Sequence, residues 1–108
     1  MANILSANIV QEKNKWHISG DVLMDNANLI MLKSETLSMS DGFVVDFAEV
    51  TKVDTAALSL IMEWQRRAFA ATYKVSFANL PLNLSRLLAL YGVAEFVPVR
   101  GELANFLY

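Results

Sequence analysis

The sequence changes from strand-like to helix-like at Asp54 and Thr55, and this change constrains the fold more than any other feature. Residues 43–47 form a short apolar run typical of a strand buried on both faces, and residues 50–55 remain β-like. Residues 56–62 are then almost entirely apolar and helix-forming. Because a buried strand that leads into a helix is the building unit of parallel sheets, the sequence predicts an α/β domain.

The N-terminal third is predicted to contain a hairpin and a helix. The β-prone segments 4–10 and 16–20 flank a polar turn, which is the pattern of two antiparallel strands. Asp25 can cap a helix that extends to Met39. Within it, helical spacing relates Leu29, Leu32, Thr36 and Met39.

The central helix is expected to begin at Asp54 or Thr55, both good N-caps, and to end near Ala71 or Thr72. Its core stripe would consist of Ala57, Leu60, Ile61, Trp64, Ala68 and Ala71. The first two turns are apolar almost all round, which leaves Leu58 and Met62 beside this stripe. We therefore expect these two side chains to be exposed and available to a partner.

The C-terminal half returns to the strand–helix pattern. A strand is predicted at 74–78, then a helix with Pro81 in its first turn that ends at Gly92. The apolar positions of that helix are Leu84, Leu87, Leu88 and Tyr91. Residues 96–99 would form an edge strand, and 101–108 a short apolar tail. The whole is one domain over residues 1–100, with a mixed sheet of about four to five strands and helices packed against it.

Composition argues against several classes of function. Nine Lys and Arg stand against eleven Asp and Glu, without a basic stripe, so nucleic acid is not expected as a partner. The chain has no cysteine, and its four glycines are isolated, which excludes thiolate metal sites and a P-loop. No apolar stretch approaches the roughly 20 residues of a spanning helix, and the start does not resemble a signal peptide. A cytoplasmic protein is expected.

Catalytic residues are not evident. His17 is the only histidine and falls in a predicted strand, where a surface role is expected. The carboxylates of Asp21, Asp25, Asp46 and Asp54 lie at predicted strand ends and helix starts, where capping and turn formation explain them. We therefore predict a non-enzymatic protein with no cofactor and no metal.

Thr55 is the most informative polar residue. A hydroxyl at a helix N-terminus lies where backbone N–H groups and the helix dipole would stabilise a phosphoryl group. The alternative is that Thr55 or Asp54 only caps the helix. Both interpretations concern the start of the central helix, at Asp54 and Thr55.

The chain resembles the STAS domain family from the hairpin to Val99. Residues 18–22 (Ile-Ser-Gly-Asp-Val) and 44–50 (Val-Val-Asp-Phe-Ala-Glu-Val) are similar to two strands of the family, and 87–93 to its final helix. Residues 53–58 (Val-Asp-Thr-Ala-Ala-Leu) resemble its Asp-Ser/Thr-x-Gly-Leu signature. Ala57 replaces the signature glycine, and Ala56 stands where many anti-sigma factor antagonists carry serine.

The resemblance implies one of two functions. STAS subunits of the lipid-asymmetry (Mla) ABC transporter, the MlaB type, carry Asp-Thr at this point and bind the cytoplasmic ATPase subunit. Anti-sigma factor antagonists instead carry a phosphorylated hydroxyl, modified by an anti-sigma kinase. Asp54 and Thr55 favour the Mla type.

The expected partner-binding site is centred on Thr55. It would include Asp54 and Ala56, with Leu58, Ser59 and Met62 supplying the contact. Through the ATPase the protein would lie at the inner face of the inner membrane, without inserting into it. The same apolar surface is suited to a homodimer when the partner is absent.

Overall fold

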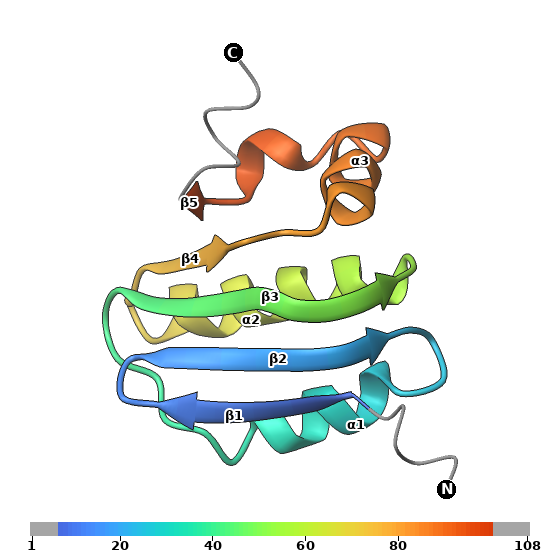
Figure 1. Cartoon of the computed structure of the whole chain (residues 1–108). Helices are drawn as coiled ribbons and strands as arrows, with labels where there is room; N and C mark the ends of the chain where they lie inside the picture. The colour runs from blue at the N-terminus through green and yellow to red at the C-terminus, as the bar shows by residue number, and fades with distance from the viewer. Residues whose placement is uncertain (1–6, 101–108) are drawn as a thin grey trace, which may run out of the picture.

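Strand β3 (Phe43–Val53) lies at the centre of a five-stranded sheet of order β1-β2-β3-β4-β5 (Figure 1). The structure is a computed structural model that describes residues 7–100. Strands β1 (Asn8–Glu12) and β2 (Lys15–Val22) form an antiparallel hairpin. Strands β3, β4 (Val75–Ala78) and β5 (Val99–Arg100) continue from β2 in parallel. The prediction of an α/β domain with an N-terminal hairpin is confirmed.

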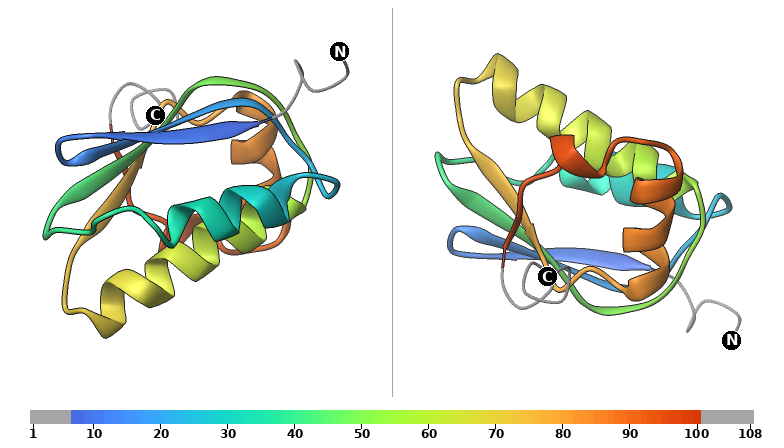
Figure 2. Two further views of the ribbon diagram at one scale, coloured as in Figure 1. Left: turned by 90° about the horizontal axis from the view of Figure 1, so that it is seen from below. Right: turned by 90° about the horizontal axis from the view of Figure 1, so that it is seen from above.

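Three helices connect the parallel strands. They are α1 (Ala27–Ser34), α2 (Ala56–Ala70) and α3 (Leu82–Leu90), and a 3₁₀ helix η2 (Ala94–Phe96) precedes β5. Each crossover leads to the next strand in the same direction across the sheet. Because such crossovers are right-handed, the three helices lie on one side of the sheet (Figure 2).

Strand β3 is longer than its neighbour β2 because its pairing contains two irregularities. Two steps along β2, from His17 to Ser19, oppose three steps along β3, from Asp46 to Glu49. A second shift follows Gly20. Each extra residue rotates the following side chains to the other face, so buried residues recur at 47 and then at 50.

The core is built around two tryptophans. Trp16 from β2 and Trp64 from α2 are fully buried and meet edge to face, with ring centroids 5.9 Å apart. The Trp64 Nε1–H donates to Ser34 Oγ at 2.9 Å, and that hydroxyl donates to the Met31 carbonyl at 2.6 Å. Arg67 Nη1 also donates to Ser34 Oγ, at 3.1 Å. Ser34 is therefore a buried hub that joins α1 to α2.

Helix α1 differs from its prediction in extent. It begins after Asn26 rather than at Asp25, and it ends at Ser34 rather than Met39. Asn26 fixes the turn before the helix, since its Oδ1 accepts from Leu23 N at 2.8 Å. Ile30 and Ser34 are buried, whereas Leu29 and Leu32, two of the residues at helical spacing, are exposed. The hydrogen bonds of Ser34 hold this face of α1 against the core. A hydrophobic pattern in the sequence cannot indicate them.

The C-terminal part also departs from the prediction. Helix α3 ends before Gly92, whose φ of +72° suits a glycine, as expected. Tyr91, the last apolar position of the predicted helix, follows the end of α3 and is 57 % exposed, and Ala71 of the α2 stripe is also exposed. Residues 94–96 form η2, and β5 begins only at Val99, after Pro98. The predicted tail at 101–108 lies outside the described residues.

The Ser34 hub gives a direct test of the core. Replacing Ser34 by Ala leaves the buried Trp64 Nε1–H without its acceptor, so the free energy of unfolding should fall by about 1–3 kcal/mol. Urea denaturation followed by tryptophan fluorescence measures this loss. Ser38→Ala is the matched control, because Trp16 Nε1 uses only the backbone carbonyl of Ser38. Equal stability of the Ser34→Ala and Ser38→Ala proteins would contradict the role of the hub.

Candidate functional site

Asp54 follows β3 directly and is held on two sides. Its Oδ1 accepts from Ala56 N at 2.8 Å, and its Oδ2 accepts from Met24 N at 3.0 Å. Asp54 therefore ties the loop after β2 to the start of α2. Thr55 already has helical φ and ψ (−63° and −17°) and makes no capping hydrogen bond with its side chain. Of the two residues predicted to cap the helix, Asp54 is the one that does so.

Thr55 forms the ridge between two surface hollows. The first, which we call the α2–α3 groove, has a volume of about 680 Å³ and is lined by Thr55, Leu58, Ser59, Met62, Glu63, Arg66, Tyr91 and Val93. The second, of about 380 Å³, is bounded by Asp54 and Thr55 on one side and by Asn83, Arg86 and Leu90 of α3 on the other. Because no cap bond holds it, the Thr55 hydroxyl is available at this ridge.

The predicted site residues are only partly brought together. Thr55, Ser59 and Met62 line the α2–α3 groove, and Asp54 lies on the other side of the ridge. Leu58 differs from its prediction, because it is only 8 % exposed and belongs to the hydrophobic core. Ala56 is partly exposed but lines neither hollow. Leu58 is buried because α3 packs beside α2, a contact that the pattern of α2 alone does not reveal.

Sequence reasoning missed the far wall of the groove. Tyr91 and Val93 follow α3 and face the first half of α2 across the groove. The sequence pattern includes Tyr91 as the last apolar position of the predicted helix. The turn at Gly92 instead ends α3 at Leu90 and leaves the Tyr91 side chain at the surface. The helix-ending glycine was the signal that could have indicated this.

An ion-pair network borders the groove. Glu63 accepts from Arg66 Nε at 2.9 Å and from Arg66 Nη2 at 2.6 Å, and Arg67 Nε lies 3.2 Å from the same carboxylate. The hydrogen bond from Arg66, helped by Arg67, lowers the pKa of Glu63 from 4.5 to about 2. The same contact raises the pKa of Arg66. This rim of the groove therefore carries paired charge rather than an isolated carboxylate.

His17 and Asp46 lie on β2 and β3, away from the groove. His17 Nε2 is 3.3 Å from Glu12, and its Nδ1 is 3.7 Å from Asp46 Oδ2. Asp46 is buried and accepts from Ala48 N and from Asn79 Nδ2, which gives it a structural task. Within residues 7–100 no cluster of three His, Cys, Asp or Glu side chains could hold a metal ion.

Comparison with known proteins identifies a family and a similar solved structure. The family model described as "Mlab, STAS domain" matches residues 6–99. The solved structure of the anti-sigma factor antagonist SpoIIAA in its unphosphorylated form is similar, with a TM-score of 0.67 and 12 % identity over 94 % of this chain and 93 % of that one. No curated protein sequence matches. Between residues 7 and 100, no helix is long and apolar enough to cross a membrane.

The capping role of Asp54 can be tested against that of Asp25. Asp54→Ala removes the acceptor of two backbone N–H groups, so the free energy of unfolding should fall by about 1–2 kcal/mol. Asp25→Ala should change it little, because Asp25 is exposed and lies one residue before Asn26, the N-cap of α1. Chemical denaturation of both variants measures the difference. A larger loss of stability in Asp25→Ala than in Asp54→Ala would instead support the prediction that Asp25 caps a helix.

The Glu63 network predicts a specific acid response. The folded-state pKa of Glu63 lies below its ordinary value of 4.5, so the stability from this pairing is present above about pH 4.5 and is lost as the pH falls toward 2. NMR titration of the Glu63 carboxyl should show a midpoint near 2 in the native protein. Arg66→Gln should raise that midpoint toward the ordinary value. An unchanged midpoint in Arg66→Gln would contradict the assignment of Arg66 as the main cause.

Proposed function

The chain belongs to the STAS domain family, and we propose that it is a non-enzymatic adapter that binds and regulates the cytoplasmic ATPase of an Mla-type phospholipid-trafficking ABC transporter. Domains of this family interact with partner proteins. The MlaB-type family model and the Asp54-Thr55 pair both favour the transporter branch. The sequence has no Gly-rich phosphate loop, so nucleotide would be bound by the partner.

One observation carries this proposal. The Thr55 hydroxyl makes no capping hydrogen bond to the helix and lies on the ridge between the two hollows. A partner that covers this ridge would contact Thr55 at the centre and Ser59, Met62, Tyr91 and Val93 along the α2–α3 groove. These five residues are here called the docking surface. Leu58 would support this surface from below rather than contact the partner, because it is buried.

Regulation requires that the adapter distinguish between states of its partner. A bound protein shifts a conformational equilibrium only by the difference between its affinities for the two states. Asp54 holds the start of α2 against the loop after β2, which gives the docking surface a fixed shape. A rigid surface of this kind would favour the ATPase conformation that matches it. In this way the domain would act from the inner face of the membrane without entering it.

Thr55→Glu tests the docking surface. A carboxylate buried against the partner without a counter-charge should reduce co-purification of the ATPase by more than about tenfold, whereas Thr55→Ser should have little effect. Pull-down of tagged protein from its native host, with the recovered proteins identified by mass spectrometry, measures this. Thr36→Glu is the matched control, because Thr36 is exposed beyond the end of α1. Equal recovery with Thr55→Glu and Thr36→Glu would place the interface elsewhere.

The alternative is an anti-sigma factor antagonist switched by phosphorylation of Thr55. The observation that favours it is the same unbonded hydroxyl, which lies at the N-terminus of a 15-residue helix where a phosphoryl group would be stabilised. The same pull-down separates the two functions. Recovery of a small anti-sigma kinase, together with a phosphorylated Thr55 peptide, would replace the transporter proposal. Recovery of an ATPase and its permease with unmodified Thr55 would support it.

A further inference from the structure

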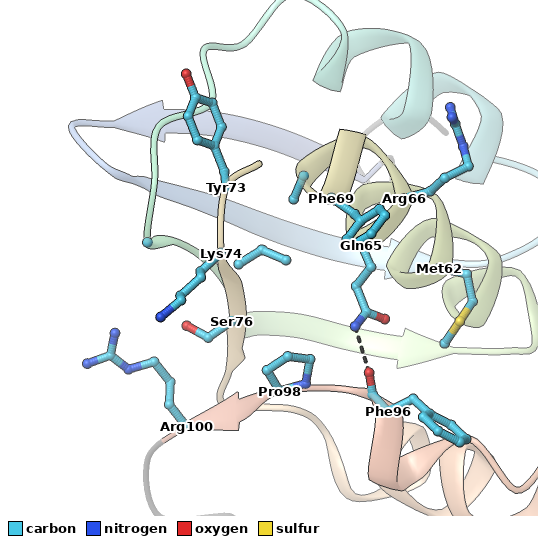
Figure 3. Close-up of a pocket in the computed structure, with 13 residues that line it drawn as sticks. Met62, Gln65, Arg66, Phe69, Tyr73, Lys74, Ser76, Phe96, Pro98 and Arg100 are labelled. Atoms are coloured by element: carbon cyan, nitrogen blue, oxygen red, sulfur yellow. Dashed lines mark hydrogen bonds between the residues drawn. The ribbon is translucent and has the colours of Figure 1, made fainter. Parts of the chain in front are cut away.

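A second groove lies along the C-terminal half of α2, beyond the docking surface. Its volume is about 800 Å³, and we call it the β4 groove because β4 forms its floor. Helix α2 contributes Gln65 and Phe69 to one wall, while Phe96 and Pro98 form the other (Figure 3). Gln65 Nε2 donates to the Phe96 carbonyl at 2.7 Å and holds η2 against α2.

At the floor of the groove, the edge of β4 is open at Val75. Strand β5 opposes only Phe77 and Ala78 of β4, and the Phe77 N–H donates to the Pro98 carbonyl at 2.8 Å. Backbone polar groups alternate between the two sides of a strand, so those of Val75 face the same side as those of Phe77. Among residues 7–100 no strand pairs with that side of Val75.

Residues 96–98 precede β5 but do not extend its pairing to Val75, for two reasons. A parallel ladder extended back from Phe77 would pair the Val75 C=O with the N–H of residue 98, and proline has none. It would also pair the Val75 N–H with the Phe96 carbonyl, which instead accepts from Gln65. An unpaired strand edge is a template for a strand from another chain.

The side chains around this edge define what such a strand should carry. Phe69 is 85 % exposed and Phe96 is 63 % exposed, so one end of the groove presents apolar surface to solvent. Lys74 and Arg100 lie with Ser76 at the other end (Figure 3). Three basic residues and no acidic residue are among the described residues that line the groove. Only Arg66 of the three pairs with a carboxylate of residues 7–100.

We propose that the β4 groove binds an extended segment of a partner protein, which adds as a strand to the open edge of β4. The segment carries a large apolar side chain that packs between Phe69 and Phe96. It also carries one or more carboxylates that pair with Lys74 and Arg100. This site goes beyond the docking surface, because it recognises a linear peptide rather than a folded face, and Thr55 takes no part in it.

Selection from a library of short random peptides displayed on phage tests the chemistry of the segment. Peptides that combine acidic with large apolar residues should be enriched on the full-length protein. The double variant Lys74→Glu, Arg100→Glu should weaken binding of the enriched peptides by about tenfold or more, since two attractive pairs become repulsive. Lys52→Glu is the charge control, because Lys52 is exposed on β3 and does not line the groove.

A second pair of variants tests the apolar end. Phe69→Ser should weaken peptide binding by about fivefold or more, because it removes a large contact from the groove wall. Leu90→Ser is the matched control, since Leu90 is 78 % exposed and lies on α3, outside the groove. Both side chains are exposed, so both variants should keep the native fold. Thr55→Glu should leave peptide binding unchanged, which separates this site from the docking surface.

Backbone methylation of the enriched peptide tests strand addition. N-methyl groups at alternate residues should abolish binding in one register, where the amides face β4, and be tolerated in the other. Several results would overturn the proposal: no enrichment, enrichment of peptides without acidic residues, or equal binding to the Lys74→Glu, Arg100→Glu protein. So would equal tolerance of both methylation registers. Binding to phosphatidylglycerol vesicles or self-association that depends on Phe69, without peptide binding, would assign the groove to a membrane or a second copy instead.

Discussion

Burial of β3 on both faces is the constraint on which the rest of the structure depends. Phe43, Val45 and Phe47 belong to the hydrophobic core, while Val44 and Asp46 point to the opposite face of the sheet and are each only 8 % exposed. Both neighbours of β3 are parallel to it, so the chain enters and leaves β3 through crossover helices. The register shifts against β2 then extend β3 until its last residue reaches the start of α2. The ridge at Thr55 is therefore placed by the centre of the sheet.

The order of strands and helices was predictable from the sequence because it depends on local signals. The buried run at 43–47, the cap at Asp54 and the glycine after α3 each act within a few residues. Side-chain orientation in α1 was not predictable in this way. Its buried face is selected by the bond between Ser34 and Trp64, residues separated by 30 positions in the chain. A polar contact of that kind leaves no hydrophobic period in the sequence.

The candidate site was predictable in its centre but not in its walls. Asp54 and Thr55 were found because a strand that changes into a helix must place its capping residues at the sheet edge. Exposure of Leu58 was predicted wrongly because the pattern of one helix cannot show that a second helix packs beside it. The β4 groove had no sequence signal of its own. It arises because Pro98 and the Gln65–Phe96 bond divert the chain away from β4.

Met62 and Arg66 line both the α2–α3 groove and the β4 groove. A shared wall would link the two grooves thermodynamically if an occupant of either groove moved Met62. Whichever rotamer of Met62 an occupant of one groove selects is the rotamer that an occupant of the other must accept. The resulting coupling free energy is reciprocal: if a peptide in the β4 groove changes the affinity of the docking surface by some factor, the docked protein changes the affinity for the peptide by the same factor. Met62 alone would then let the domain respond both to the protein on its docking surface and to the peptide in its β4 groove.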